Sequence, residues 1–165
     1  MTVTVVVGNP KPASRTLDAA VRLASRFGEQ PEVVDIITLG AGLLGWGDPA
    51  VADPMATVKN SRLIVVASPT FKATYTGVLK LFLDQFATGT GLENVVAIPL
   101  MLGAGPTHAL APELLLKPVL VELGAICPTP GLYQLDADYR DDPVADNWFE
   151  RWGPVVLELA GRDRP

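Results

Sequence analysis

The segment from Gly8 to Thr16 has the residue types and the spacing of an anion-binding loop. It reads Gly-Asn-Pro-Lys-Pro-Ala-Ser-Arg-Thr and lies between an apolar run and a helical pattern. Amides at a helix N-terminus point toward an anion, and the helix dipole favours its charge. Two hydroxyls and the Arg15 guanidinium add charge-assisted hydrogen bonds. We predict that this loop holds a phosphate; the alternative is a helix cap alone, with Ser14 as N-cap and Asp18 in the first turn.

Two common nucleotide-binding patterns do not fit this loop. In a Walker A loop, Ala13 would stand where the second Gly belongs and Ser14 where the Lys belongs. In the dinucleotide pattern G-x-G-x-x-G, Pro10 would occupy the second Gly position, where close backbone approach to a pyrophosphate is needed. The loop therefore favours a compact terminal phosphomonoester.

Two further loops carry unusual residues. The segment 68–77 reads Ser-Pro-Thr-Phe-Lys-Ala-Thr-Tyr-Thr-Gly, which combines aromatic and hydroxyl side chains with small residues suited to a flat ring. Lys72 either places positive charge near the polar edge of that ring or is a solvated lysine. The segment 102–107 has Gly103 and Gly105, which allow close backbone approach. The next residue, His108, is the only histidine, and we expect it to cap or pack rather than to donate a proton.

The elements that must position these loops alternate between strands and helices. The predicted strands are 3–7, 33–37, 63–67, 95–101 and 132–135; the predicted helices are 14–27, 54–60, 77–86, 108–123 and 144–160. The strands are continuously apolar, as in a parallel sheet that is covered on both faces. Ligands of such sheets bind beyond the carboxyl ends of the strands, so the three loops should share one site.

Composition limits the remaining possibilities. The 165 residues fit one α/β domain, 1–165; 48% are hydrophobic and 19% charged, which excludes disorder. The net charge of -5 argues against nucleic-acid binding. Cys127 is the only cysteine, and we expect a small hydrophobic residue rather than a reactive thiol. No metal-ligand cluster is recognisable. No membrane-length run or signal-peptide pattern is present, so we expect a cytoplasmic protein without a membrane partner.

For three other segments we prefer a purely structural interpretation. The stretch 40–53, which carries Trp46, is expected to be a surface connection, with a lid or an interface as the alternative. The stretch 136–142 has four aspartates and is expected to be a solvated loop. Trp148, Phe149 and Trp152 are expected to pack a C-terminal helix onto the core.

The chain resembles the NAD(P)H-dependent FMN reductases of the flavodoxin-like fold, and more narrowly the reductases of sulfonate-desulfonating two-component monooxygenases. The resemblance covers roughly residues 3–135. The motifs that carry it are Gly8-Asn9-Pro10 with Ser14-Arg15-Thr16, Ser68-Pro69-Thr70-Phe71-Lys72-Ala73, Tyr75-Thr76-Gly77, Leu79-Lys80 with Asp84, Gly103 to Gly105 with His108, Leu110-Ala111, and Leu116-Lys117-Pro118-Val119-Leu120. It departs from the family where Phe71 replaces a frequent Tyr and Ala104 replaces a frequent second Gly.

This resemblance implies a doubly wound five-stranded parallel sheet with strand order 2-1-3-4-5. It also implies that Ser14, Arg15 and Thr16 bind the FMN 5′-phosphate, that residues 69–73 line the flavin ring and that residues 103–105 flank it. The full set of predicted cofactor-binding residues is Asn9, Pro10, Ser14, Arg15, Thr16, Pro69, Thr70, Phe71, Lys72, Ala73, Gly103, Ala104 and Gly105.

The implied activity is hydride transfer from NADPH or NADH to FMN, with reduced FMN released to a monooxygenase. Because the two rings react with each other, we expect no catalytic residue in the strict sense. Lys72 is our hypothesis for a positive group near flavin N1. The alternatives are a quinone or azo reductase with tightly held FMN, a non-enzymatic flavodoxin-like electron carrier, and an interaction domain that has lost the ligand. The resemblance further implies a homodimer or homotetramer.

Overall fold

A five-stranded parallel sheet forms the centre of the molecule in the computed structural model, which describes residues 1–28 and 30–162. The strands are β1 (Val3–Val7), β2 (Glu32–Asp35), β3 (Leu63–Pro69), β4 (Val96–Gly103) and β5 (Leu132–Leu135). Their order in the sheet is β2-β1-β3-β4-β5, and each neighbouring pair is parallel. The predicted fold class and strand order are therefore confirmed.

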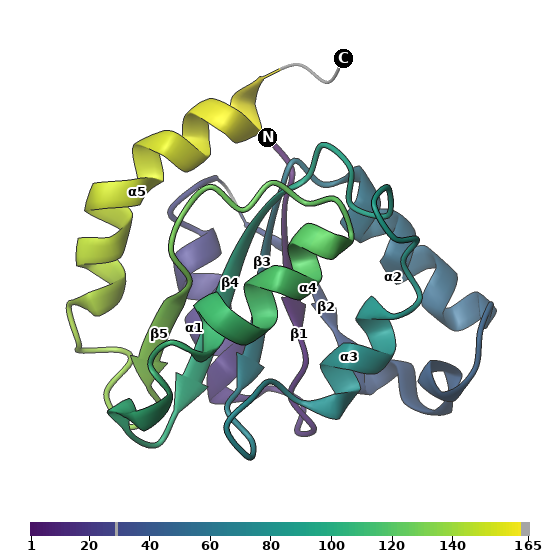
Figure 1. The fold of residues 1–165 in the computed structure, drawn as a ribbon, viewed down its shortest axis with the longest axis horizontal. Coiled ribbons are helices and arrows are strands. Elements are labelled where there is room, and N and C mark those ends of the chain that lie inside the picture. Colours follow the sequence, from purple (N-terminus) through teal and green to yellow (C-terminus); the bar gives the residue numbers. More distant parts are fainter. Residues whose placement is uncertain (29, 163–165) are drawn as a thin grey trace.

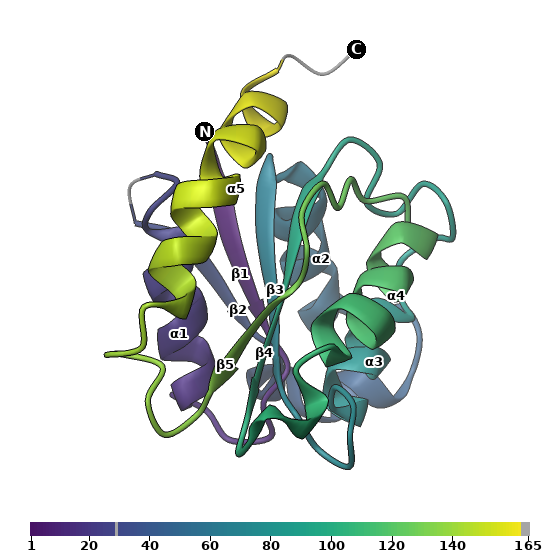
Figure 2. The ribbon, with the colours of Figure 1, turned by 60° about the vertical axis from the view of Figure 1, so that its left-hand side comes forward.

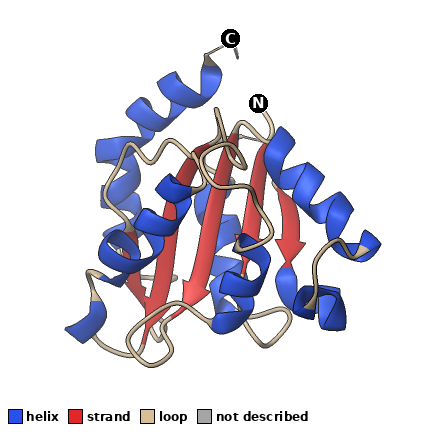
Figure 3. Ribbon diagram, turned by 45° about the vertical axis from the view of Figure 1, so that its right-hand side comes forward, coloured by secondary structure: helices blue, strands red, loops and turns tan. Residues whose placement is uncertain are grey.

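The connecting elements lie on both faces of this sheet (Figures 2 and 3). They are α1 (Arg15–Ala24), the 3₁₀ segment η1 (Ile36–Leu44), α2 (Pro49–Asn60), α3 (Gly77–Leu83), the 3₁₀ turn η2 (Pro106–His108), the π-helical turn η3 (Pro112–Leu116), α4 (Lys117–Glu122) and α5 (Val144–Gly161). Helices α1 and α5 cover one face, and α2, α3 and α4 cover the other.

Alternation along the central strands explains the two-sided core. In β1, Val5 and Val7 pack with the α1 and α5 face, whereas Val6 packs with the α2, α3 and α4 face. All three valines are buried, as a parallel strand with helices on both sides requires. Edge strand β2 is the exception, because its Val33 is 47% exposed.

Several predicted boundaries are wrong for local reasons. The stretch 40–53 is not a continuous loop, since η1 extends into it and α2 begins at Pro49. Asp48 caps α2 by accepting from the Ala50 amide, and Pro49 is at its first turn, where a missing N–H costs nothing. The predicted helix 108–123 is divided into η2, η3 and α4, with Pro112 and Pro118 at the starts of the last two.

The aromatic residues of α5 pack as predicted. Trp148 is buried and its Nε1 donates to the Pro130 carbonyl at 3.0 Å. The Phe149 ring meets Phe27 edge to face with centroids 5.0 Å apart. Within the described residues no helix is long and apolar enough to cross a bilayer.

Candidate functional site

The carboxyl ends of β1, β3, β4 and β5 surround a cavity of about 510 Å³ at the edge where strand order reverses. This volume is in the range of small-molecule and cofactor sites. These strand ends point toward the lower edge of Figure 1. The lining residues are Asn9, Lys11, Pro12, Ala13, Ser14, Arg15, Thr16, Pro69, Thr70, Phe71, Leu102, Gly103, Ala104 and Asp136. The three loops singled out in the sequence therefore do meet at one cavity.

The first loop is held in shape by its own side chains. Asn9 Nδ2 donates to Thr16 Oγ1 at 3.1 Å, and Asn9 Oδ1 accepts from the Lys11 amide at 2.9 Å. Ser14 is the N-cap of α1, and its Oγ accepts from the Leu17 amide at 3.2 Å. The cap interpretation of Ser14 is thus correct. It is compatible with an anion site, because each hydroxyl can still donate its own hydrogen.

Gly8 has a packing role. A Cβ at this position would lie 2.3 Å from Leu79 Cβ, so only glycine lets β1 approach α3 this closely. The Gly8 carbonyl also accepts from Thr76 Oγ1 at 2.5 Å, and Thr76 is the N-cap of α3. The first and second loops are therefore joined directly at the base of the site.

The second loop turns sharply at its centre. Phe71 and Thr74 exchange backbone hydrogen bonds of 2.8 and 3.2 Å, which leaves Lys72 and Ala73 as the two turn residues. Both have positive φ, 51° and 72°, as a type I′ turn requires. Phe71 stands at the cavity and is 49% exposed. The turn places Lys72 and Ala73 outside the cavity lining.

A buried polar atom points to a ligand in this cavity. Thr70 Oγ1 is buried and has no hydrogen-bond partner within the described part of the chain, although the Thr70 amide donates to the Leu102 carbonyl at 2.6 Å. Unpartnered buried hydroxyls are uncommon in folded proteins. A ligand with polar groups along one edge would satisfy it.

Tyr133 packs against the third loop and hydrogen-bonds to its backbone. A Cβ on Gly103 would lie 1.9 Å from the Tyr133 hydroxyl, and that hydroxyl donates to the Gly105 carbonyl at 2.7 Å. Gly103 and Ala104 line the cavity, whereas Gly105 does not. Pro10, Lys72 and Ala73 are the other predicted residues outside the lining.

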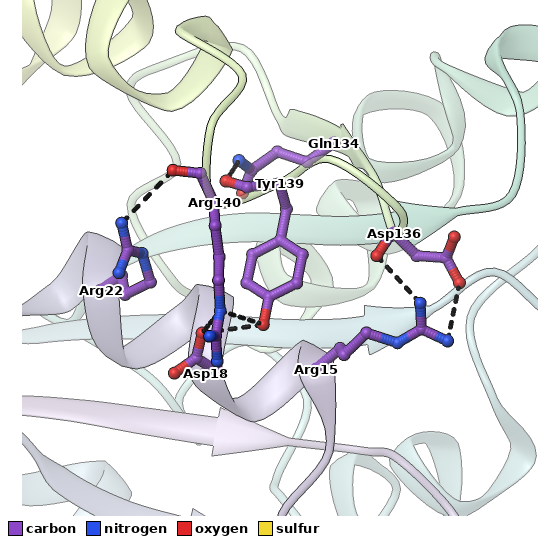
Figure 4. A network of polar contacts seen from close by, with 7 residues as sticks. All are labelled: Arg15, Asp18, Arg22, Gln134, Asp136, Tyr139 and Arg140. Carbon is purple, nitrogen blue, oxygen red and sulfur yellow. Dashed lines mark hydrogen bonds and ion pairs between the residues drawn. The ribbon is translucent and has the colours of Figure 1, made fainter.

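Sequence reasoning missed Asp136, the first residue after β5. We expected 136–142 to be a solvated loop, and this is wrong in part, since Asp136 lines the cavity and Tyr139 is buried. Arg15 Nη1 donates to the Asp136 carbonyl at 3.1 Å, and its Nη2 lies 3.5 Å from Asp136 Oδ2 (Figure 4). The short apolar strand before Asp136 was the available signal, because its carboxyl end must reach the same sheet edge.

Tyr139 connects this loop to α1. Its hydroxyl donates to Asp18 Oδ2 at 2.8 Å, and Arg140 Nε donates to the same oxygen at 3.1 Å (Figure 4). Gln134 Nε2 donates to the Tyr139 carbonyl at 3.1 Å. Burial, together with the hydrogen bond to Asp18, raises the pKa of Tyr139. The phenol therefore stays a neutral donor and fixes the loop against the first turns of α1.

A second carboxyl lies near the first loop. Asp35, at the carboxyl end of β2, has a pKa raised by burial against the opposing effect of the backbone amides of Ala13 and Ile37. Elsewhere, burial raises the pKa of the half-buried Cys127 thiol to about 11, so at neutral pH it is not the thiolate that a reactive cysteine needs.

Comparison with known proteins places the chain in a family. The model of the NADPH-dependent FMN reductase family matches residues 1–139. The chain belongs to this family. Over 98 residues it is 37% identical to FMN reductase (NADPH) of Escherichia coli strain K12, and this match covers 58% of the chain and 51% of the relative. Over 107 residues it is 28% identical to NADH-dependent FMN reductase SfnF of Pseudomonas fluorescens strain Pf0-1, and this match covers 62% of the chain and 55% of the relative.

The matches thus span about half the length of these curated relatives. Among solved structures, the apo form of the NADH:FMN oxidoreductase EMOB is similar with a TM-score of 0.79 and 24% identity, covering 99% of this chain and 91% of that one. An oxidoreductase from Corynebacterium diphtheriae has a TM-score of 0.73 and 23% identity, and the match covers 98% of this chain and 96% of that one. At these identities the structures support the flavodoxin-like fold.

Proposed function

We propose that this chain is an NAD(P)H-dependent FMN reductase. The observation that carries the proposal is the cavity at the strand-order reversal, which is lined by the first residues of α1, including Arg15, and by Thr70, Phe71 and Gly103. A flavin mononucleotide has the matching chemistry, since it joins a terminal phosphate to a flat ring with polar edges. Family membership supports the same conclusion.

We propose separate binding roles for two groups of lining residues. The N-terminal amides of α1, Arg15 and the hydroxyls of Ser14 and Thr16 bind the phosphate. The unpartnered Thr70 hydroxyl and the backbone at Gly103 contact the ring edge. When bound, FMN supplies the group that accepts a hydride from the nicotinamide. The role of the chain itself is to orient the ring for the nicotinamide.

Lys72 remains our proposal for a positive charge near the flavin, although its turn lies outside the cavity lining. Replacing Lys72 with Ala should lower the reduction potential of the bound flavin, because a nearby cation stabilises the reduced anion. Unchanged flavin affinity, turnover and potential would remove this role.

The proposed activity is tested by steady-state oxidation of NADPH and of NADH with FMN, FAD and riboflavin as acceptors. We expect saturable turnover with FMN. Such turnover would reject a non-enzymatic electron carrier, and protein that purifies yellow and resists flavin removal would favour a quinone or azo reductase. The proposal fails if flavin fluorescence shows no quenching on addition of the protein.

We further propose that reduced FMN leaves to serve a flavin-dependent monooxygenase, which is what the narrower sequence resemblance implies. This is tested with the protein and NADPH or NADH on one side of a dialysis membrane, FMN on both sides, and cytochrome c as an electron acceptor on the other side, without oxygen. The supply role predicts reduction of the acceptor across the membrane. Reduction only when protein and acceptor share a compartment would contradict it.

We also propose that the chain forms a homodimer or homotetramer. An apolar groove of about 380 Å³ between Ala73 and the 106–115 segment supports this. Leu110, Leu114 and Leu115 on this segment are all exposed, at 65%, 61% and 40%. Contiguous apolar surface of this kind marks an interaction site. A cytoplasmic location stays a prediction.

A further inference from the structure

Asp136 places a negative charge beside Arg15, the side chain to which the phosphate is proposed to bind. It is the first residue beyond β5, and its amide donates to the Gly103 carbonyl at 3.0 Å, which continues the pairing of β5 with β4. The backbone of Asp136 is therefore fixed beside the third loop. Its side chain is about one-third exposed, at 37%, and lines the cavity together with Arg15.

The Arg15 guanidinium is already engaged by this residue. Nη1 donates to the Asp136 carbonyl and Nη2 lies 3.5 Å from the carboxylate, so both terminal nitrogens of Arg15 are directed toward β5 (Figure 4). The described cavity lining contains two cationic side chains, Arg15 and Lys11, and one acidic side chain, Asp136. A phosphate that binds Arg15 must share the guanidinium with a carboxylate or displace it.

The loop that carries Asp136 is held in place on its far side. Tyr139 and Arg140 both bond to Asp18, which is one turn beyond Arg15 on α1. The Asp138 amide donates to the Leu135 carbonyl at 3.3 Å, which closes the turn immediately after Asp136. Since both flanks are fixed, Asp136 cannot leave the cavity edge without breaking these contacts.

We propose that Asp136 competes with the flavin phosphate for Arg15 and thereby weakens FMN binding, so that FMN exchanges as a substrate. This inference rests on the proposed function, because it needs the FMN phosphate at Ser14–Thr16. Asp136 is in this sense a specificity-determining residue: it acts on the phosphate of FMN and not on the ring that riboflavin shares with it.

The test is equilibrium binding of FMN and of riboflavin, measured by flavin fluorescence quenching without nicotinamide. Replacing Asp136 with Asn keeps the shape and removes the charge. The FMN Kd should fall roughly three- to tenfold, as expected when one partly exposed ion pair no longer competes with a dianion. The riboflavin Kd should not change. Stopped-flow dilution should show a correspondingly slower release of FMN.

Asp138→Asn is the matched control, because Asp138 is an exposed aspartate of the same loop outside the cavity lining. It should leave both Kd values at the wild-type level. In an Arg15→Ala background, Asp136→Asn should tighten FMN binding less than it does in the wild type. The guanidinium for which Asp136 and the phosphate compete is then absent.

The inference is overturned if Asp136→Asn leaves FMN binding unchanged, weakens it, or tightens FMN and riboflavin equally. An equal gain with Arg15 present and absent would also overturn it. These outcomes differ from failure of the proposed function, which would appear in the wild-type protein as no binding of either flavin.

Discussion

At the scale of single residues, the first loop (Gly8 to Thr16) contains side chains that hold its shape and one side chain, Arg15, whose tip is bound to Asp136. Asn9, Ser14 and Thr16 make hydrogen bonds within the loop or to the first turn of α1. Thr16 is also buried, so replacing it would disturb the fold as well as the site. Arg15 is 64% exposed, lines the cavity and is bound at its tip by Asp136. Its removal therefore reports on binding with little effect on stability.

Arg15→Ala should raise the Kd of FMN about tenfold, because a charge-assisted hydrogen bond to phosphate is lost. Riboflavin, which lacks the phosphate, should bind as it does to the wild type. Fluorescence quenching measures both constants. Arg22→Ala removes an exposed arginine from the same helix outside the cavity and should change neither. Equal losses for the two flavins would contradict a phosphate role.

At the scale of elements, close contacts between neighbouring elements keep the site loops in register. Gly8 lets β1 meet α3, and Gly103 lets β4 pass over Tyr133. On the far side, Glu113 of η3 accepts from Lys117 Nζ at 2.9 Å and from the Gly131 amide at 2.7 Å, which joins η3 to the segment before β5. These contacts relate the strand ends to one another.

Gly8→Ala should lower the free energy of unfolding by about 1–3 kcal/mol, as overpacking does in dense cores. The added methyl would meet the Leu79 side chain and backbone at the β1 and α3 contact. Urea denaturation measures the change. Gly105→Ala is the matched control, since nothing lies within 4 Å of its Cβ position, and it should stay near wild type. A Gly8→Ala protein of unchanged stability would show that the strand and helix can separate freely.

Glu113 should make stability depend on pH. Burial alone would raise its pKa, but the hydrogen bonds from Lys117 and the Gly131 amide outweigh burial and lower the pKa below the ordinary 4.5. A lowered folded-state pKa means that the stabilisation is fully present above pH 4.5 and is lost as pH falls through the folded-state value.

In Glu113→Gln this contribution is absent. The wild type should therefore lose more unfolding free energy than the variant between neutral pH and a pH below 4.5. Urea titrations at the two pH values measure the difference. Parallel losses in both proteins would assign the acid sensitivity to other carboxyls.

At the scale of the whole molecule, the exposed leucines of the 106–115 segment should control assembly. Leu114→Glu should shift a homo-oligomer toward the 17.5 kDa monomer, because a charge in an apolar interface is costly to bury. Light scattering after size-exclusion chromatography measures the mass. Leu157→Glu, on exposed surface of α5, should keep the wild-type mass. A monomeric wild type would contradict the proposed assembly.

The sequence predicts most of the architecture, because buried parallel strands are continuous apolar runs that are hard to mistake. Strand 3–7 and strand 132–135 have the predicted limits. The start of α2 and the division of the predicted helix 108–123 were not predicted. Capping by Asp48 and the prolines at 112 and 118 determine these boundaries within single turns, which a periodicity pattern does not reveal.

The site was predictable where loops follow strands and less so where distant segments meet. Ser14, Thr70 and Gly103 come from the three loops singled out in the sequence, and all three line the same cavity. The turn at Lys72 and Ala73 was missed because positive φ is unusual for those residues. Asp136 was missed because its importance depends on Arg15, which is 121 residues away in the chain.

The half-buried cysteine has a practical consequence. Cys127 lies in the connection between α4 and β5, which is held by the parallel bridge of Ile126 with Val96 and by Lys117 on the Thr129 carbonyl. A thiol with a pKa of about 11 reacts with alkylating reagents mainly when this connection opens to solvent. The alkylation rate of Cys127 is therefore expected to follow the opening of the connection between α4 and β5.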